Sequence, residues 1–451
     1  MSHDLSALAA EVPRPGPVPQ LRVGPPARAL LGNGLDAMVL RRATVPRLEL
    51  RLTVPAGSAL GPSVAASQLL RSGLLLGSGE LSQEEVSEAV QRLGGSLSVH
   101  LDQDRIQIAA SALAEAEEEL YRLICQVVTE PRLPQPELET ERVKLIEGLR
   151  IARATPQFLA GEHLEQLLYP GHPYGRPAPS DRDIRQVSRE RLLRLREACF
   201  LPASSQVTVV GDLEPRRTLA RLEQAFAPWQ GRRRPPRLPP LRTTGRPGTT
   251  FIGRPGSVQT VILSAASAPP LGHRDYIPLN LAAAVLGGSF SSRLMANLRE
   301  DKGYTYSPHS RTESHLLDSL VQTSIEVRSE VTAPAQVEFL HELGRLATVE
   351  VGADELENCR SYLAGVRVIT LQTQAGLAGS LAQLRVHGLD QRYLETYSRR
   401  LRAVSPAELR RVAARYLGPA SQTMVLVGDR ALAKELAQVT PLTLVRSSSR
   451  A

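Results

Sequence analysis

The histidines and cysteines of this chain are spaced too widely to form an obvious metal site. Two imidazoles four residues apart on one helix face can bind the same zinc ion, but none of the nine histidines has another at that spacing. His172 falls in "GHPYG", where we expect a structural turn. Cys125, Cys199 and Cys359 form no C-x-x-C pair. We expect them to be small buried hydrophobic residues, part of neither a disulfide framework nor a cysteine-rich zinc site.

The charge pattern argues against binding to nucleic acid. The net charge is +8, but the basic residues are almost all arginines and are dispersed among 46 acidic residues. Aromatic residues make up only 4% of the chain, and no known nucleic-acid-binding module is visible. We interpret the basic residues as an ordinary solvated surface.

The apolar patterning bounds the size and location of the protein. A chain of 451 residues that is 42% apolar is expected to build more than one core. No apolar run approaches the roughly 20 residues of a membrane-spanning helix. The first residues show neither a basic start nor a continuous apolar stretch, so no secretory signal is visible. We therefore expect a cytoplasmic protein with no membrane span.

The chain contains an internal duplication. The string "PASSQVTVVGD" at 202–212 returns as "PASQTMVLVGD" at 419–429. Likewise "ELETERVKLIEGLR" at 137–150 returns as "ELENCRSYLAGVRV" at 355–368, with almost the same separation. Val187-Ser188 is matched in the same way by Val404-Ser405. Three matches in the same order indicate two related halves.

The duplication and the local composition predict the domain boundaries. We place the two halves at 24–228 and 248–440. The segment 229–247 between them is so rich in proline, arginine and glycine that it favours neither a helix nor a central strand, which predicts a linker. Residues 1–23 are then an N-terminal extension and residues 441–451 a tail.

Each half has strands early and helices later. The capping box Ser82 to Glu85 marks the start of one helix. This order predicts an α+β fold in which helices pack on one face of a mainly antiparallel sheet. We expect strands at 47–54, 258–267, 304–310 and 319–328, a strand pair at 96–112, and helices at 63–76, 82–95, 276–288 and 291–300.

Several of these segments together resemble one known family. They are "LLLGSGELSQEEVSEAVQRLGGSL", "ETERVKLIEGL", "LLYPGHPYGRP", "VVGDLEP" and "GGSFSSRLMANLREDKGYTYS", in this order. The chain is similar to the pitrilysin and insulinase-type zinc peptidases, and most similar to their processing-peptidase-like branch, over about residues 25–435. The resemblance implies that the whole chain, with its two homologous halves, forms one half of a clamshell.

The resemblance also implies a zinc motif, H-x-x-E-H, that this chain has lost. The motif falls on "QLLRS", so that Gln68, Arg71 and Ser72 stand where the family has its two histidines and its catalytic glutamate. An amide and a hydroxyl are weak zinc ligands, and Arg71 is a permanent cation. Glu147 matches the later zinc-ligand glutamate. We expect this chain to bind no cofactor, and we hypothesise that an ion pair between Arg71 and Glu147 replaces the metal.

The second half departs less from the family. In "LREDKGYTYS", Arg299 and Tyr306 match an arginine and a tyrosine that line the chamber opposite the zinc. The resemblance implies that both donate hydrogen bonds to a carbonyl of the bound peptide, where oxyanion charge develops. From the residues alone, the favoured interpretation is that Arg299 pairs with a nearby acid such as Asp301 and that Tyr306 is a sheet aromatic. The resemblance reverses this preference.

The resemblance implies a two-chain enzyme. This chain would be inactive alone and would form a heterodimer with a homologous H-x-x-E-H subunit, which binds the zinc. Its Arg299 and Tyr306 would serve the shared chamber, and the substrate would be a peptide or a small unfolded protein in extended form. The alternative is a non-enzymatic scaffold, a core subunit of a larger complex.

Overall fold

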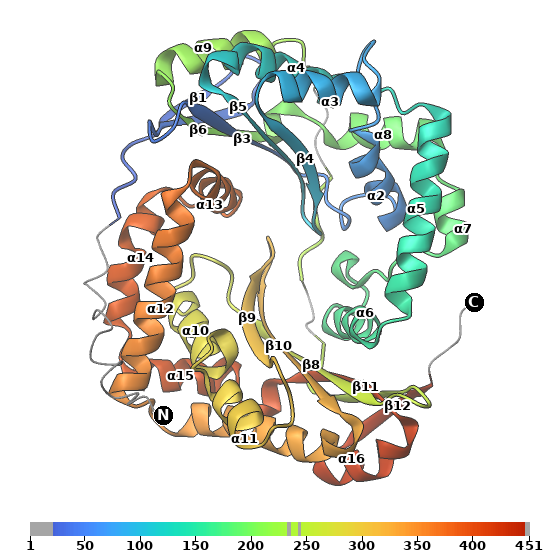
Figure 1. Cartoon of the computed structure of the whole chain (residues 1–451), viewed down its shortest axis with the longest axis vertical. Coiled ribbons are helices and arrows are strands. Elements are labelled where there is room, and N and C mark those ends of the chain that lie inside the picture. The colour runs from blue at the N-terminus through green and yellow to red at the C-terminus, as the bar shows by residue number, and fades with distance from the viewer. Residues whose placement is uncertain (1–20, 232–235, 242–244, 447–451) are drawn as a thin grey trace, which may run out of the picture.

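The protein is built on two six-stranded mixed sheets, seen at the top and bottom of Figure 1. The computed structural model describes residues 21–231, 236–241 and 245–446. The strand orders are β1-β2-β6-β3-β5-β4 and β12-β7-β11-β8-β10-β9. Antiparallel pairs predominate in both sheets, and the parallel pairs are β2 with β6, β7 with β11 and β7 with β12. The predicted two-half α+β fold is confirmed.

The first half contains, in chain order, the following strands and helices: β1 Ala27–Leu30, β2 Asp36–Arg41, β3 Arg47–Val54, α2 Val64–Gly73, α3 Gln83–Arg92, β4 Ser96–Leu101, β5 Ile106–Leu113, α4 Glu117–Thr129, α5 Gln135–Arg153, α6 Pro156–Leu168, α7 Asp181–Arg185, α8 Arg189–Cys199, β6 Gln206–Gly211 and α9 Pro215–Phe226. Short 3-10 turns are η1 Ala114–Ala116, η2 Pro173–Gly175 and η3 Pro202–Ser204. The predicted capping box between Ser82 and Glu85 starts α3.

The second half repeats this order: β7 Gly248–Gly253, β8 Gln259–Ala268, α10 Tyr276–Ala283, the π-helical segments η4 Ala284–Gly288 and η5 Met295–Asp301, β9 His309–Ser314, β10 Ser319–Arg328, α11 Thr332–Thr348, α12 Ala353–Gln372, α13 Gln374–Val386, α14 Arg392–Ala403, α15 Pro406–Tyr416, β11 Thr423–Gly428, α16 Ala433–Val439 and β12 Leu442–Arg446. Its 3-10 turns are η6 Ser329–Val331, η7 Pro419–Ser421 and η8 Arg430–Leu432.

The repeated motif occupies the same place in both sheets. β6 and β11 are its two strands, each follows a 3-10 turn, and each pairs with one parallel and one antiparallel neighbour. The preceding helices α8 and α15 are both capped by a serine, Ser188 and Ser405, whose hydroxyl accepts a bond from a backbone N–H three residues on. The duplication therefore preserves a strand, its entry turn and its helix.

Each half also places one helix on the sheet of the other. α6 of the first half packs on β8 and β11, and α13 of the second half packs on β3 and β6 (Figure 1). The half's own helices, such as α4 and α9, cover the opposite face. β11 is buried along its whole length because both of its faces are covered. The helices of each half therefore cover one face of its own sheet, as expected, and a helix of the other half covers the second face.

Buried polar contacts hold α13 on the first sheet. Arg385 donates to the carbonyl oxygen of Val207 and to Thr208 Oγ1, both at 2.7 Å, and pairs with the carboxylate of Asp36 at 2.8 Å. Burial lowers the pKa of Arg385, while the neighbouring Asp36 acts in the opposite direction. These contacts fix the two halves relative to one another.

The junction between the halves also contains the predicted "GHPYG" turn. His172 Nδ1 accepts a bond from the backbone N–H of Tyr174. The Tyr174 hydroxyl donates to Asp104, whose other oxygen accepts a bond from the backbone of Leu316 in the second half. The turn is structural, as expected.

Some residues beyond the predicted edges of the two halves pack with those halves. Trp229 is fully buried in the first core and donates to the carbonyl oxygen of Phe200, although it was assigned to the linker. Part of the expected tail forms β12, which pairs with β7. Leu21 and Val23, from the expected N-terminal extension, pack against the second core. Residues 1–20, 232–235, 242–244 and 447–451 of the predicted extension, linker and tail lie outside the described residues. Elsewhere the domain boundaries stay a prediction.

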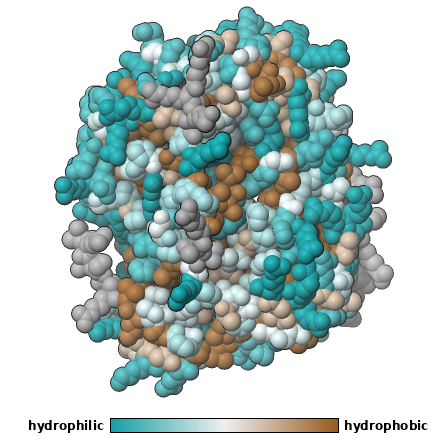
Figure 2. Space-filling model, turned by 180° about the vertical axis from the view of Figure 1, so that it is seen from behind, coloured by the Kyte–Doolittle hydropathy of each residue, from teal (hydrophilic) through white to brown (hydrophobic). Residues whose placement is uncertain are grey.

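The three cysteines are buried and free, which confirms their expected role as core residues. Burial raises the pKa of each thiol to about 11. Seen from behind, the surface is largely hydrophilic, with apolar side chains gathered near the middle of the face and in smaller groups near its top and bottom (Figure 2). Among the described residues no helix is long and apolar enough to cross a membrane.

Candidate functional site

The degenerate zinc motif lies on α2, in the first half. Ser63 caps this helix, and its buried face packs into the first core. Arg71 is exposed. The Ser72 hydroxyl donates to the carbonyl oxygens of Gln68 and Leu69 in the preceding turn. Arg71 therefore faces solvent, and Ser72 bonds to the helix backbone, so the two side chains do not meet at a common point.

Glu147 lies on α5, which packs against α2. Its side chain is 52% exposed and pairs with Arg150 at 3.5 Å, one turn away on the same helix. Arg71 and Glu147 are both described, and they form no ion pair. The hypothesis of an ion pair in place of the metal is therefore wrong. The physical reason is that Glu147 is solvated, so its charge needs no buried partner.

The chemistry of this region does not fit a catalytic zinc ion. Zinc requires three or four nitrogen, sulfur or carboxylate ligands at short range. Of Gln68, Arg71, Ser72 and Glu147, only Glu147 is a ligand of that kind. In the part of the chain that the structure describes, no group of three or more histidine, cysteine, aspartate or glutamate side chains is placed to hold a metal ion.

Gln68 instead lines a hollow of about 380 Å³ between α2, α6 and the turn after β4. Its Oε1 atom is buried without a hydrogen-bond partner among the described residues. Glu162 and Glu165 of α6 line the same hollow. The surrounding protein raises the pKa of Glu165 to about 7 by desolvation, and the charges of Glu313 and Glu162 act in the same direction. The side chain of Glu165 nevertheless stays open to solvent.

Arg299 and Tyr306 come together in the second half. The Arg299 guanidinium lies over the Tyr306 ring, 4.7 Å from its centre, and over the Phe290 ring, 5.0 Å from its centre. Tyr306 is 80% exposed and Phe290 is 70% exposed. We call these three residues the arginine sandwich. A guanidinium carries its N–H groups in its own plane, and of these the Nε of Arg299 lies beside Glu300, at 3.3 Å.

The local structure around the sandwich differs from the prediction in two respects. Tyr306 lies in the loop between η5 and β9, so the expected strand at 304–310 begins only at His309. Asp301 pairs with Lys302, while the Nε atom of Arg299 lies 3.3 Å from Glu300. Asp301 is thus not the partner of Arg299, but the expectation that Arg299 pairs with a nearby acid is met by Glu300. The alternative of a sheet aromatic at Tyr306 is wrong, because Tyr306 lies outside β9.

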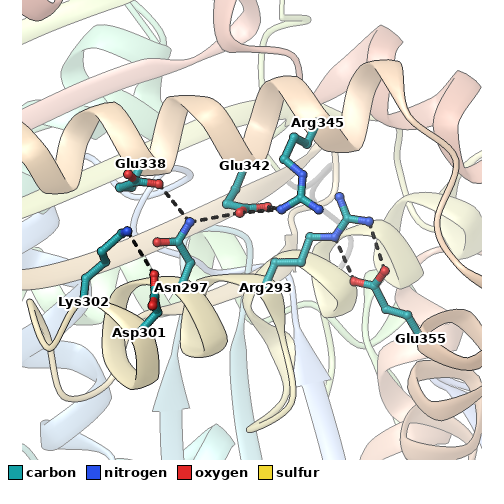
Figure 3. A network of polar contacts seen from close by, with 8 residues as sticks. All are labelled: Arg293, Asn297, Asp301, Lys302, Glu338, Glu342, Arg345 and Glu355. Carbon is teal, nitrogen blue, oxygen red and sulfur yellow. Dashed lines mark hydrogen bonds and ion pairs between the residues drawn. The ribbon is translucent and has the colours of Figure 1, made fainter.

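A polar network ties η5 to the helices behind it (Figure 3). Arg293, just before η5, makes a bidentate pair with Glu355 of α12, at 2.8 and 3.0 Å. Asn297 donates to Glu338 and Glu342 of α11 at 2.9 and 3.0 Å. The network anchors the segment that carries Arg299 to α11 and α12, although the rings of Phe290 and Tyr306 are exposed to solvent.

Phe290 is the member of the site that sequence reasoning missed. It lies between the two π-helical segments, in a stretch of glycines and serines. A large aromatic residue inside "GGSFSS" is a signal that could have singled it out, because such a stretch offers little local core to bury it. Only the folded loop, however, shows that its ring contacts Arg299.

Family models match both halves of the chain. The model described as Insulinase (Peptidase family M16) matches residues 37–181, and the model described as Peptidase M16 inactive domain matches residues 186–363. The first contains the degenerate motif, and the second contains the arginine sandwich. Together they account for most of the chain.

Several relatives are named uncharacterized zinc protease. The one from Mycobacterium leprae is 25% identical over 289 residues, which are 63% of this chain and 65% of the relative, a little under two thirds of its length. The one from Streptomyces coelicolor is 22% identical over 368 residues and covers 78% of each chain. The one from Bacillus subtilis is 20% identical and covers 76% of this chain and 83% of the relative.

Solved structures share the fold. The peptidase M16 inactive domain from Pseudomonas fluorescens aligns with a TM-score of 0.84 at 20% identity, over 90% of this chain and 98% of that one. A protease from Helicobacter pylori aligns with a TM-score of 0.82 at 19% identity, over 90% of this chain and all of that one. The motifs, the two-half fold and the two matching models agree, and the chain belongs to the pitrilysin and insulinase-type peptidase family, M16.

Proposed function

We propose that this chain is the non-metal-binding subunit of a heterodimeric zinc metallopeptidase. It pairs with a homologous subunit that carries H-x-x-E-H and holds the zinc ion. Its own contribution is the arginine sandwich, whose Arg299 and Tyr306 bind the substrate peptide and stabilise charge on a carbonyl oxygen during cleavage. Alone, the chain has no peptidase activity.

One contrast carries the proposal. The residues at the zinc-motif position are poor metal ligands, whereas the arginine and the tyrosine expected to bind substrate are both present. Gln68, Arg71 and Ser72 supply no adequate zinc site. Arg299 and Tyr306 stack together on an anchored segment, and Tyr306 is 80% exposed. Two exposed aromatic rings around a guanidinium gain only about 0.5–1 kcal/mol from stacking at an exposed site. Stability alone is therefore a weak reason for the arrangement, and binding is a better one.

Edge strands offer a mode of binding for an extended peptide. β4 lies at one edge of the first sheet, and β9 lies at one edge of the second. The loop with Tyr306 leads directly into β9. A peptide that adds a strand to β9 would place its carbonyl groups along the same edge as this loop. We infer that the substrate is a peptide or a small unfolded protein.

Assembly with a partner tests the proposal. Co-expression with the H-x-x-E-H homologue should give a 1:1 complex, with an interface above roughly 1,200 Å². The complex should cleave peptides and contain zinc in the partner, whereas this chain alone should hold no stoichiometric zinc. Size-exclusion chromatography with light scattering, metal analysis and a peptide-cleavage assay measure the three outcomes.

Two results would overturn the proposal. A chain that stays monomeric at micromolar concentration beside the partner has no place in a two-chain enzyme. A chain that binds one equivalent of zinc and cleaves peptides alone is itself the enzyme. A complex that forms but cleaves equally well with a sandwich-free variant of this chain would favour the scaffold role.

A further inference from the structure

Helix α12 exposes an apolar face where a surface helix normally carries charges. Tyr362, Val366 and Ile369 are 45%, 44% and 68% exposed. Ser361 and Thr370 are exposed too, so every exposed residue between 361 and 370 is uncharged. A helix that faces only water keeps charged or strongly polar residues on that side. We call Tyr362, Val366 and Ile369 the α12 stripe.

The related helix of the first half shows that the common fold does not require such a face. α5 and α12 correspond through the internal repeat and lie on opposite sides of the molecule (Figure 1). The exposed face of α5 carries Lys144, Glu147 and Arg150. Lys144 and Glu147 correspond to Tyr362 and Gly365, so α12 has an aromatic residue and a glycine where α5 has two charges. The fold accepts charges at these positions, and their absence from α12 needs another reason.

The α12 stripe continues the helix face that anchors the arginine sandwich. Glu355 of α12 pairs with Arg293, which lies three residues after Phe290. Tyr362 lies seven residues after Glu355, and the other two stripe residues lie 11 and 14 residues after it, so all four share one face of α12. Seven residues of helix span about 10 Å. The stripe therefore begins about two turns from the anchor of the sandwich and extends along α12.

The size of the stripe favours a peptide over the surface of another folded protein. Three side chains form too small a surface for a stable protein interface, which buries roughly 1,200 Å² or more. An extended chain advances about 3.3 Å per residue, so three or four residues span the roughly 10 Å of the stripe. Because the face is uncharged, it favours aliphatic or aromatic side chains over charged ones.

We propose that the α12 stripe binds apolar side chains of the extended peptide whose carbonyl group contacts Arg299 and Tyr306. The inference rests on the proposed function and names its substrate class, which is an unfolded segment with a run of aliphatic or aromatic residues. The stripe covers about 10 to 20 Å from Glu355, a distance that an extended chain spans in about three to six residues. The apolar run should therefore lie about three to six residues from the bond that is cleaved.

Kinetics of the assembled complex test the inference with matched variants. Val366→Gln with Ile369→Gln removes the aliphatic side chains of the α12 stripe. Val143→Gln with Ile151→Gln is the control on α5, where these residues are 49% and 70% exposed. Glutamine is at least as favourable in a helix as valine or isoleucine, so both variants should fold. The substrates are two otherwise identical peptides with Leu-Val-Leu or Ser-Thr-Ser placed about three to six residues from the cleaved bond, on either side of it.

We expect the α12 variant to raise the Michaelis constant for the Leu-Val-Leu peptide at least about tenfold, because two apolar contacts are lost. Turnover at saturating substrate should stay within about twofold, since contacts away from the reacting carbonyl are lost equally from the ground state and the transition state. The kinetic constants of the α12 variant for the Ser-Thr-Ser peptide, and those of the α5 variant for both peptides, should equal the wild-type values within about twofold.

Peptide binding to this chain alone separates the inference from the proposed function. Fluorescence anisotropy should show that the wild-type chain binds the labelled Leu-Val-Leu peptide at least about tenfold more tightly than the α12 variant does. If the complex cleaves nothing while this difference persists, the peptidase role fails and the apolar-peptide site stands. An active complex whose Michaelis constant is the same in the α12 variant overturns the inference and leaves the proposed function intact. Loss of complex assembly or of self-association in the α12 variant assigns the stripe to a contact between subunits, which overturns the inference as well.

Discussion

The two halves differ in helical regularity at corresponding positions of their common fold. Between the long strand and the following strand pair, the first half has two regular helices, α2 and α3, each capped by a serine. The second half has α10 followed by two π-helical segments. Gln68, Arg71 and Ser72 on α2 form no common site. Arg299 and Tyr306, after the π-helical turns, stack with Phe290.

This difference separates a regular segment from an irregular one at corresponding positions of the two halves. A π-helical segment costs stability relative to a regular helix and is often found at functional sites. The second half keeps this irregularity and anchors it with the Arg293 and Asn297 contacts of Figure 3. The first half is regular at the place where the resemblance puts the family's metal motif, which is consistent with our proposal that this chain holds no metal.

Loss of the sandwich donors should have the largest effect. In the assembled complex, Tyr306→Phe and Arg299→Ala should each lower turnover by about 10²- to 10³-fold, because each removes a donor to a developing oxyanion. Arg299→Ala should also raise the Michaelis constant, since a guanidinium bound to a carbonyl acts in the ground state too. Steady-state kinetics of the purified complex measure both. Unchanged turnover in an intact complex would leave this chain with a scaffold role.

Removal of the anchor behind the sandwich should have the next largest effect. Arg293 is 9% exposed, and Arg293→Met leaves the Glu355 carboxylate without its bidentate partner. We expect the free energy of unfolding to fall by about 2 kcal/mol, as for the loss of a charged hydrogen-bonded partner. Arg328→Met is the control, since its pair with Glu330 is exposed and should contribute less than about 0.5 kcal/mol. Urea titration measures both, and equal effects would show that η5 is not anchored by this pair.

Glu165 provides a smaller, pH-dependent test near the degenerate motif. Its pKa is about 7 in the folded chain, above its ordinary value of 4.5, so the folded state binds more protons between these values. Its stabilising contribution is complete below pH 4.5 and is lost as the pH rises through 7. Glu165→Gln should match the wild type at pH 4.5 or below and be more stable at pH 8, by less than about 1 kcal/mol because the side chain is open to solvent.

Carboxyl NMR of the wild-type chain gives the midpoint directly. Glu313→Gln should lower the Glu165 midpoint, because the Glu313 charge contributes to the shift. A midpoint between 4 and 5 in the wild type would remove the basis of this prediction.

The smallest effects are expected at the vacated motif itself. Arg71 is exposed, and the Glu147 pair with Arg150 is exposed as well. Arg71→Ala and Glu147→Ala should change the free energy of unfolding by no more than about 0.5 kcal/mol and leave turnover of the complex within a few-fold. A large loss of turnover in either variant would show that the first half still takes part in the chemistry.

Sequence reasoning was most successful where local signals act alone. The strand at 47–54 and the capping box at Ser82 are found as predicted, since alternation and capping depend on neighbouring residues. The prediction of an Arg71–Glu147 ion pair was wrong, because matching a residue to a position in the family motif does not show whether its side chain faces solvent. Tyr306 was assigned to a strand because aromatic alternation in "YTYSPHS" resembles one. Its backbone instead forms the loop after η5.

The sequence by itself determined the duplication, the family, the absence of an H-x-x-E-H motif and the presence of Arg299 and Tyr306 in "LREDKGYTYS", because these depend on residue types and their order. Only the tertiary structure decided that α6 and α13 cross to the opposite sheets, that Phe290 joins the sandwich, and that Arg71 and Glu147 stay apart. The physical reason is that each of these depends on surfaces brought together from distant parts of the chain. Which of these surfaces pack together depends on their burial and shape, and a local sequence pattern does not determine it.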